Sequence, residues 1–141
     1  MSTNYAVVAG AGSLRPPGDG VVAFPHRWTD AGVAVRLEFT GAHLLHLATA
    51  GCVLNDLYRE AAVLGIELDG VRVSASGEFD PASWVSTGIV YSVELDSPAA
   101  PDEVVRLLEQ VDAVAEIPRA IRAGAPVART AAEPGDGSAT A

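Results

Sequence analysis

Residues 40–65, TGAHLLHLATAGCVLNDLYREAAVLG, are the stretch of sequence that decides the fold. Thr40 is a typical N-cap residue, because its hydroxyl can accept a hydrogen bond from an unpaired N–H group of the first helical turn. Gly65 suits the left-handed residue that closes a helix. The residues between them predict one long helix whose first half is apolar on nearly every face. Such a helix is expected to be buried, in a domain core or in a subunit interface.

Short apolar stretches surround this helix and alternate with turn residues, which predicts strands. The expected strands are 5–9, 21–24, 32–39, 66–68, 71–77 and 88–95. Residues 13–20, SLRPPGDG, carry adjacent prolines and two glycines and are expected to form a loop. The short connections between the first three strands predict an antiparallel meander. Alternation in the last two strands predicts a sheet with one face covered by the long helix.

Two closing helices are expected at 102–115 and 117–123. The first begins with two carboxylates, Asp102 and Glu103, which suit the positive end of a helix. Strands, a buried helix, further strands and a closing helix pair make an α+β order. We therefore expect one domain over residues 1–127. Residues 128–141 are small, polar and glycine-containing, and they predict a disordered C-terminal tail.

The composition limits the class of protein. The chain has 141 residues, of which 49% are hydrophobic, so it can bury a core without structural staples, and its single cysteine cannot form an intrachain disulfide. Nine basic against 18 acidic residues give a formal charge of −9, which would repel nucleic acid phosphates. No basic and apolar leader is visible, and no apolar run reaches the roughly 18 residues of a membrane span. We expect a soluble, cytoplasmic protein that binds neither nucleic acid nor membrane.

Four runs of the sequence resemble the OsmC/Ohr family of thiol-dependent hydroperoxide reductases. They are LLHLATAGCVLNDLYREA, GIELDGVRVSASGEFD, STGIVYSVELD and AIRAGAPV. The resemblance covers about residues 40–127 and is weaker over 1–39. It implies an OsmC-like α+β fold, with antiparallel sheets wrapped around central helices in an intertwined homodimer whose active sites lie at the interface. It also implies that Cys52 occupies the position of the cysteine that attacks the peroxide and becomes a sulfenic acid.

The sequence departs from the family pattern at two places. The resemblance implies a second, resolving cysteine some ten residues before the GAPV segment, where this chain has Ala115-Glu116. It also implies a Pro-Glu pair ten to eleven residues before the first cysteine. This chain has Gly41-Ala42 at those positions, followed by His43. Arg15 is the candidate for the arginine that the family places in its N-terminal loop.

Cys52 is either a reactive thiolate or an inert, buried cysteine. A free cysteine has a pKa of about 8.5, which a cation or a helix N-terminus must lower before the thiol becomes a nucleophile. Cys52 lies about three turns inside its helix, where the helix dipole helps little. Asp56, one turn later, would raise the pKa of the thiol, whereas Arg15 or Arg59 would lower it.

Several polar groups accompany the cysteine. His43 and His46 are neighbours on the helix surface, but no metal-binding spacing accompanies them, so no metal site is expected. His43 is a candidate acid/base group in place of the missing glutamate, or a polar residue lining an interface cavity. Glu116 is either a solvated helix-end charge or a carboxylate that points at Cys52. Unpaired polar groups are costly beside a buried segment, so a cavity is expected near Asn55 and Asp56.

Three functions remain open. The first is non-redox acid/base chemistry (a cyclisation, isomerisation or dehydration) on an apolar small molecule in a dimer-interface pocket, with a biosynthetic role as one setting. Candidate catalytic residues are Cys52, His43, Asp56, Glu116 and Arg15, and candidate substrate contacts are His46, Asn55 and Tyr91. The second is a one-cysteine hydroperoxide reductase that relies on Cys52 and an external dithiol. The third is a non-catalytic binding dimer. None of the three is expected to need a cofactor.

Overall fold

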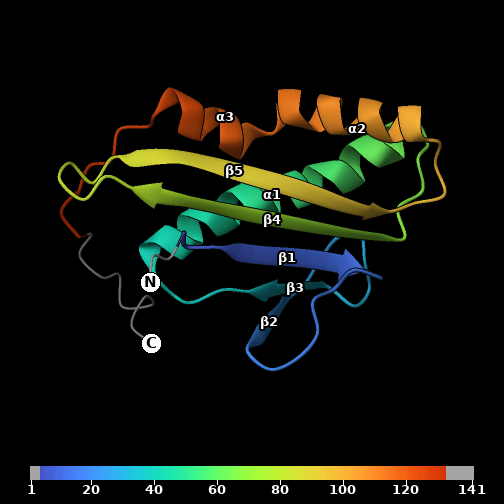
Figure 1. The fold of residues 1–141 in the computed structure, drawn as a ribbon, viewed down its shortest axis with the longest axis horizontal. Coiled ribbons are helices and arrows are strands. Elements are labelled where there is room, and N and C mark those ends of the chain that lie inside the picture. The colour runs from blue at the N-terminus through green and yellow to red at the C-terminus, as the bar shows by residue number, and fades with distance from the viewer. Residues whose placement is uncertain (1–3, 133–141) are drawn as a thin grey trace.

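Helix α1, Gly41–Leu64, lies across one face of a five-stranded antiparallel sheet in the computed structural model, which describes residues 4–132 (Figure 1). The Thr40 hydroxyl accepts a hydrogen bond from the backbone N–H of His43 at 3.1 Å, and Gly65 closes the helix with a φ of 72°. Both predicted ends of the helix are therefore confirmed. The strands are β1 Val7–Gly12, β2 Val21–Phe24, β3 Val33–Arg36, β4 Gly70–Phe79 and β5 Ser86–Asp96.

The order of strands in the sheet is β2-β3-β1-β4-β5. The predicted meander of the first three strands is wrong, because β3 and not β2 pairs with β1. The loop after β1 turns towards the start of β4, where the backbone N–H of Ser13 donates to the carbonyl of Asp69 at 2.9 Å. The inner position then goes to β3, whose Ala34 and Val35 are buried, while most of β2 is exposed at the edge.

The predicted strand at 66–68 is also wrong. The backbone N–H of Ile66 donates to the carbonyl of Ala61 at 2.8 Å, so these residues finish the helix end instead of pairing with a strand. The short apolar pattern of residues 66–68 is typical of a strand. Here Ile66 is buried directly after the end of α1 instead.

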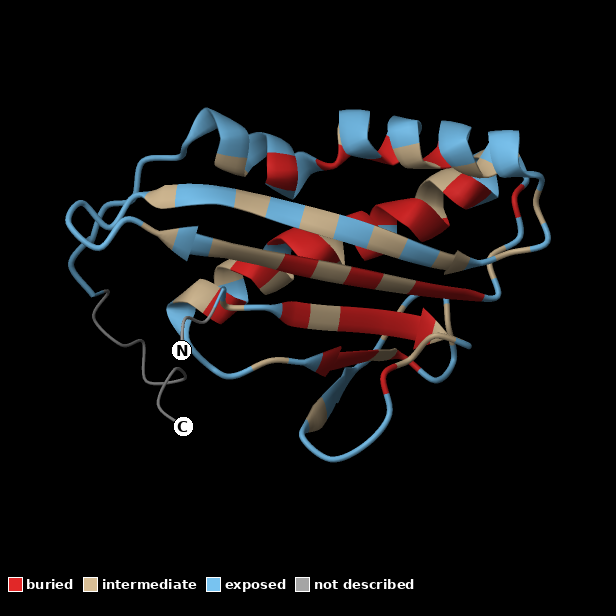
Figure 2. Cartoon of the chain, in the orientation of Figure 1, coloured by how far each residue is buried: buried red, intermediate tan, exposed pale blue. Residues whose placement is uncertain are grey.

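The core lies between α1 and the centre of the sheet, where Figure 2 shows most of the buried residues, on β1, β4 and α1. Val71, Val73 and Ala75 of β4 are buried, as the period of two predicts, whereas β1 buries the consecutive residues 9–11. The central apolar residues are Val7, Ala9, Val53, Leu54, Leu57, Val71 and Val73. A second stripe of α1, which includes Leu44, Ala48 and Asn55, stays exposed in the single chain. The helix is thus buried on one side only.

Helices α2, Pro101–Val114, and α3, Glu116–Ala123, follow one another along the side of the molecule nearest β5 and pack on α1 (Figure 1). Leu107 and Val111 bury the inner face of α2, and the fully buried Ala115 joins the two helices. None of the helices within residues 4–132 combines the length and apolar character needed to cross a bilayer.

Of the predicted tail, residues 128–132 are exposed and contain no helix or strand, while residues 133–141 lie outside the described residues. The chain is an α+β protein, as the order of elements predicts, and the strands of the described residues form one sheet.

Gly12 marks the point where the chain leaves β1. Its φ is +62°, and a Cβ added there would lie 2.2 Å from the carbonyl oxygen of Asp69. A side chain would therefore meet both backbone strain and a direct clash with the backbone before β4. Gly20, in the same loop region, also has a positive φ of 78° but has open space around it.

Candidate active site

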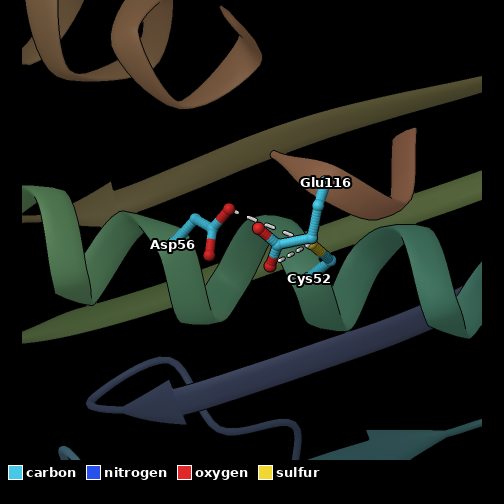
Figure 3. A group of neighbouring side chains, drawn as sticks. All are labelled: Cys52, Asp56 and Glu116. Carbon is cyan, nitrogen blue, oxygen red and sulfur yellow. Dashed lines mark hydrogen bonds between the residues drawn. The ribbon is translucent and has the colours of Figure 1, made fainter. Parts of the chain in front are cut away.

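Three of the predicted site residues meet between α1 and α3. Cys52 and Asp56 are four residues apart and share one face of α1, and α3 begins opposite them with Glu116. The Sγ atom of Cys52 lies 3.9 Å from Oδ2 of Asp56 and 3.9 Å from Oε1 of Glu116 (Figure 3). The thiol is half-buried, Asp56 is only 3% exposed and Glu116 is exposed. The cluster is therefore a thiol that lies between a buried carboxyl and an exposed one.

The surroundings of Cys52 favour the protonated thiol. Burial raises the pKa of Cys52 above its usual value, and the carboxylates of Asp56 and Glu116 add to this increase. The backbone N–H of Ile117, in the first turn of α3, opposes it by hydrogen bonding to the sulfur. The net direction is upwards, so the site is poorly suited to holding a thiolate near neutral pH.

Asp56 is a buried carboxyl with one cationic partner. Burial raises its pKa, the Arg59 guanidinium opposes the increase, and the carboxylate of Glu116 adds to it. Nη1 of Arg59 lies 3.3 Å from Oδ1 of Asp56, so the two residues, three apart on the helix, form an ion pair. Nε of Arg59 also donates to Glu60 at 3.2 Å. Asp56 is thus a group that takes up a proton more readily than an exposed aspartate does.

This raised pKa predicts a pH dependence of stability. A carboxyl with a raised pKa in the folded state binds more protons folded than unfolded, so its contribution to the free energy of unfolding falls as the pH rises above the ordinary aspartate value. Wild type should therefore lose stability relative to Asp56→Asn as the pH rises from about 4 to about 7. Urea unfolding of both proteins across this range measures the difference. A relative gain for wild type would contradict the assignment.

The two histidines of α1 lie away from the cluster. His43 is nine residues before Cys52, which places it on the opposite face of the helix and about 13 Å along it. Its Nδ1 is 2.6 Å from the Thr40 hydroxyl, and its ring meets the edge of Tyr5. The ring Nδ1 of the fully buried His46 hydrogen-bonds to the carbonyl of Tyr5 at 2.9 Å. Both histidines hold the segment before β1 against the helix.

Arg15 and Tyr91 are also separate from the cluster. Arg15 lies in the loop after β1, where its Nε is buried and has no hydrogen-bond partner among residues 4–132. The hydroxyl of Tyr91 donates to Oδ1 of Asp112 at 2.5 Å. Burial and the Asp112 carboxylate raise the pKa of Tyr91 to about 12. Tyr91 lines a cavity of about 400 Å³ between α1, β5 and α3, together with Thr49 and Pro118.

Thr49 extends the face of α1 that carries Cys52. It lies three residues before the cysteine and is buried, and its hydroxyl has no hydrogen-bond partner in the part of the chain that the structure describes. The cavity of about 400 Å³ that Thr49 lines has mixed walls, which include Ile121 and Arg122, and it lies beside the face of α1 that carries the cluster.

Asn55 makes a side-chain contact that the sequence does not predict. Its Oδ1 lies 3.0 Å from Nε2 of His26, in the segment between β2 and β3. The sequence shows a His-Arg-Trp run before a turn in this segment. The run does not indicate which face of α1 it contacts. The amide N–H groups at the start of α3 were likewise not predicted to approach Cys52.

The cluster contains the only set of described residues whose side chains have a spacing suited to a metal ion. The ligand atoms of Cys52, Asp56 and Glu116 lie within 4.8 Å of one another. One thiolate and two carboxylates could contact a divalent cation, but nothing beyond their spacing points to one. The expectation that the protein needs no metal stays a prediction.

The chain is similar to known proteins in sequence and in fold. A family model described as OsmC-like protein matches residues 35–129. The fold is similar to the crystal structure of an OsmC-like protein from Mycoplasma pneumoniae, with 12% identity, a TM-score of 0.55, and coverage of 72% of this chain and 85% of that one. An OsmC-like hydroperoxide resistance protein from Jannaschia sp. CCS1 aligns with 16% identity and a TM-score of 0.48, over 94% of this chain and 96% of that one. The search of curated proteins found no match.

Proposed function

The chain belongs to the OsmC-like protein family, and from this premise we propose that it is an enzyme in which the family scaffold performs non-redox acid/base chemistry on an apolar small molecule. The observation that carries the proposal is the pair of carboxyl groups, Asp56 and Glu116, each 3.9 Å from the Cys52 sulfur. They favour a neutral thiol where a peroxidase needs a thiolate, and they supply two groups that can exchange protons.

The two carboxyls have different surroundings, which suits different roles. Asp56 is buried and has a raised pKa, while Glu116 is exposed. In a dehydration, one carboxylate would remove a proton from carbon, and the other carboxyl, in its protonated form, would donate to the departing hydroxyl, which leaves as water. A cyclisation or isomerisation would use the same pair without loss of water. The cavity beside Thr49 would take the apolar part of a substrate against Ile89 and Ile121, although none of the cluster residues lines it.

The alternative function is a one-cysteine organic hydroperoxide reductase, and membership of the family favours it. The Cys52 thiolate would attack the terminal peroxide oxygen, an alcohol would leave, and the sulfenic acid would be reduced by an external dithiol, because the chain has one cysteine. The raised pKa of Cys52 counts against this alternative.

We also propose that the protein is a cytoplasmic homodimer. The exposed stripe of α1 supports the dimer, since Leu44 is 38% exposed and the neighbouring Ala48 and Gly51 would let a second helix approach closely. A second copy packed on this stripe would complete the burial that the apolar helix sequence predicts. It would also bring Cys52, on the adjoining part of the helix surface, to a subunit interface.

Two assays distinguish the proposed function from its alternative. The first measures deprotonation of the acid/base probe 5-nitrobenzisoxazole, for which Asp56→Asn and Glu116→Gln should each lower the rate by about 100-fold. Glu67→Gln, which removes an exposed carboxylate outside the cluster, should leave the rate unchanged. The second assay measures consumption of tert-butyl hydroperoxide with dithiothreitol, for which wild type and Cys52→Ser should be equally slow.

A hydroperoxide turnover that Cys52→Ser abolishes and Asp56→Asn preserves would contradict the proposal and support the reductase. If wild type turns over neither probe and a small molecule co-purifies with it, the protein is instead a non-catalytic binding dimer.

A further inference from the structure

The cavity of about 400 Å³ beside the Cys52 cluster carries polar groups at two places on an otherwise largely apolar wall. Its volume lies within the range of small-molecule sites. The apolar wall includes Val85, Ile89 and Ile121. The two polar places are Thr49, on α1, and Arg122, on α3.

The cavity lies away from the stripe of α1 that a second copy is proposed to cover. Of the described residues that line it, none belongs to this stripe, which runs through Leu44, Ala48 and Asn55. Thr49 is the α1 residue of the lining, and at 3.6 residues per turn it lies about 130° around the helix from the centre of the stripe. A second copy packed on the stripe therefore does not cover the α1 wall of this cavity.

Thr49 provides a buried hydroxyl that lacks a partner. The residue is 3% exposed, and its Oγ1 forms no hydrogen bond within residues 4–132. A buried hydroxyl without a partner is costly, so a ligand atom that bonds to it would remove an existing penalty. Thr49 is also one helical turn before Cys52, so a ligand group bound to its hydroxyl would lie next to the cluster.

Arg122 provides a cation with donors to spare. Its Nη2 donates to Oδ1 of Asp112 at 3.3 Å, and the same oxygen accepts a hydrogen bond from Tyr91 at 2.5 Å. A guanidinium has five N–H donors, and the described part of the chain gives Arg122 no further ion pair. No aspartate or glutamate among the described residues lines the cavity. The remaining donors therefore suit the carboxylate of a ligand.

We propose that the ligand of this cavity, and so the substrate of the neighbouring acid/base site, is a compact apolar hydroxy acid. Its carboxylate would accept hydrogen bonds from Arg122, and its hydroxyl would bond to the hydroxyl of Thr49. The apolar body would lie against Ile89 and Ile121. As the assignment of a substrate, the inference rests on the proposed function, but the binding of the hydroxy acid can be tested without turnover.

Three related compounds separate the two polar contacts. Isothermal titration calorimetry of the wild type should show that 3-cyclohexyl-3-hydroxypropanoate binds about tenfold more tightly than its methyl ester, which cannot form the charged contact with Arg122. The same hydroxy acid should bind about fivefold more tightly than 3-cyclohexylpropanoate, which lacks the hydroxyl and leaves Thr49 without a partner.

Variants assign each preference to one residue. Arg122→Gln should remove the preference for the acid over the ester and keep that for the hydroxyl. Arg119→Gln is the matched control, because it removes an exposed charge from the same helix outside the cavity, and it should keep both preferences. Thr49→Val should remove only the preference for the hydroxyl, whereas Thr49→Ser should retain it.

The inference is overturned if the hydroxy acid does not bind, if it binds no more tightly than both other compounds, or if Arg122→Gln and Arg119→Gln have the same effect. Asp56→Asn/Glu116→Gln should keep both preferences, since neither carboxyl lines the cavity. Both preferences in a wild type that does not deprotonate 5-nitrobenzisoxazole would support the assigned ligand and contradict the acid/base function. Deprotonation without either preference would overturn the inference alone.

Discussion

The double variant Asp56→Asn/Glu116→Gln is expected to increase the rate at which iodoacetamide alkylates Cys52 at pH 7.5 by about tenfold. Two unit charges about 4 Å apart interact by about 1 kcal/mol even in bulk water, so each carboxylate disfavours the thiolate by about fivefold and the two together by about 25-fold. A thiolate of lower pKa is also a weaker nucleophile, which reduces the expected gain in rate to about tenfold. Both oxygens lie 3.9 Å from the sulfur. Their removal leaves the backbone N–H groups of Ile117 and of residue 116 as the groups that favour the thiolate.

Mass spectrometry of the alkylated protein measures this rate without ambiguity, because the chain has one cysteine. The double variant Glu67→Gln/Glu109→Gln removes the same charge from exposed positions outside the cluster and controls for the net charge. It should alkylate at close to the wild-type rate. An unchanged or slower rate in Asp56→Asn/Glu116→Gln would show that the carboxylates do not suppress the thiol, and would weaken the case against the peroxidase.

Gly12→Ala is expected to lower the free energy of unfolding by about 3 kcal/mol, and Gly20→Ala by only about 1 kcal/mol. Both residues have a positive φ, so both variants carry the strain of a left-handed alanine. Only at Gly12 does the new Cβ also meet a backbone oxygen, that of Asp69, at 2.2 Å. The difference between the two variants therefore isolates the clash between the end of β1 and the chain before β4.

Urea unfolding monitored by circular dichroism measures both free energies under one condition. Equal losses for the two variants would mean that the loop before β4 moves away at little cost. The expected outcome is instead a much larger fall in the midpoint for Gly12→Ala than for Gly20→Ala, with similar slopes for all three proteins.

The parts of the fold that depend on local signals could be predicted from the sequence. The ends of α1 follow from Thr40 and Gly65, and the buried face of β4 follows from its alternation. The pairing of strands could not be predicted in the same way. The choice of β3 as the neighbour of β1 depends on the path of the loop after Gly12, which is set by contacts with residues far along the chain.

The same difference between local signals and contacts of distant residues applies to the candidate site. Cys52 and Asp56 could be placed together because their spacing on a helix is fixed, and Glu116 joins them through the turn at Ala115 between α2 and α3. The separation of His43 from Cys52 also follows from helical geometry, once nine residues are counted around the axis. The contact between His26 and Asn55 joins residues 29 positions apart and had no local signal.

The position of β1 in the middle of the sheet affects how the chain can fold. One of its edges pairs with β3, within the first 36 residues, but its other edge pairs with β4, which begins only at Gly70. During synthesis, the backbone N–H and C=O groups on one edge of β1 therefore stay unpaired until the whole of α1 and then β4 have left the ribosome. Pairing over such sequence separations is slow and exposes strand edges to other chains. A chain stopped before residue 70 is therefore expected to be a strong target for chaperones.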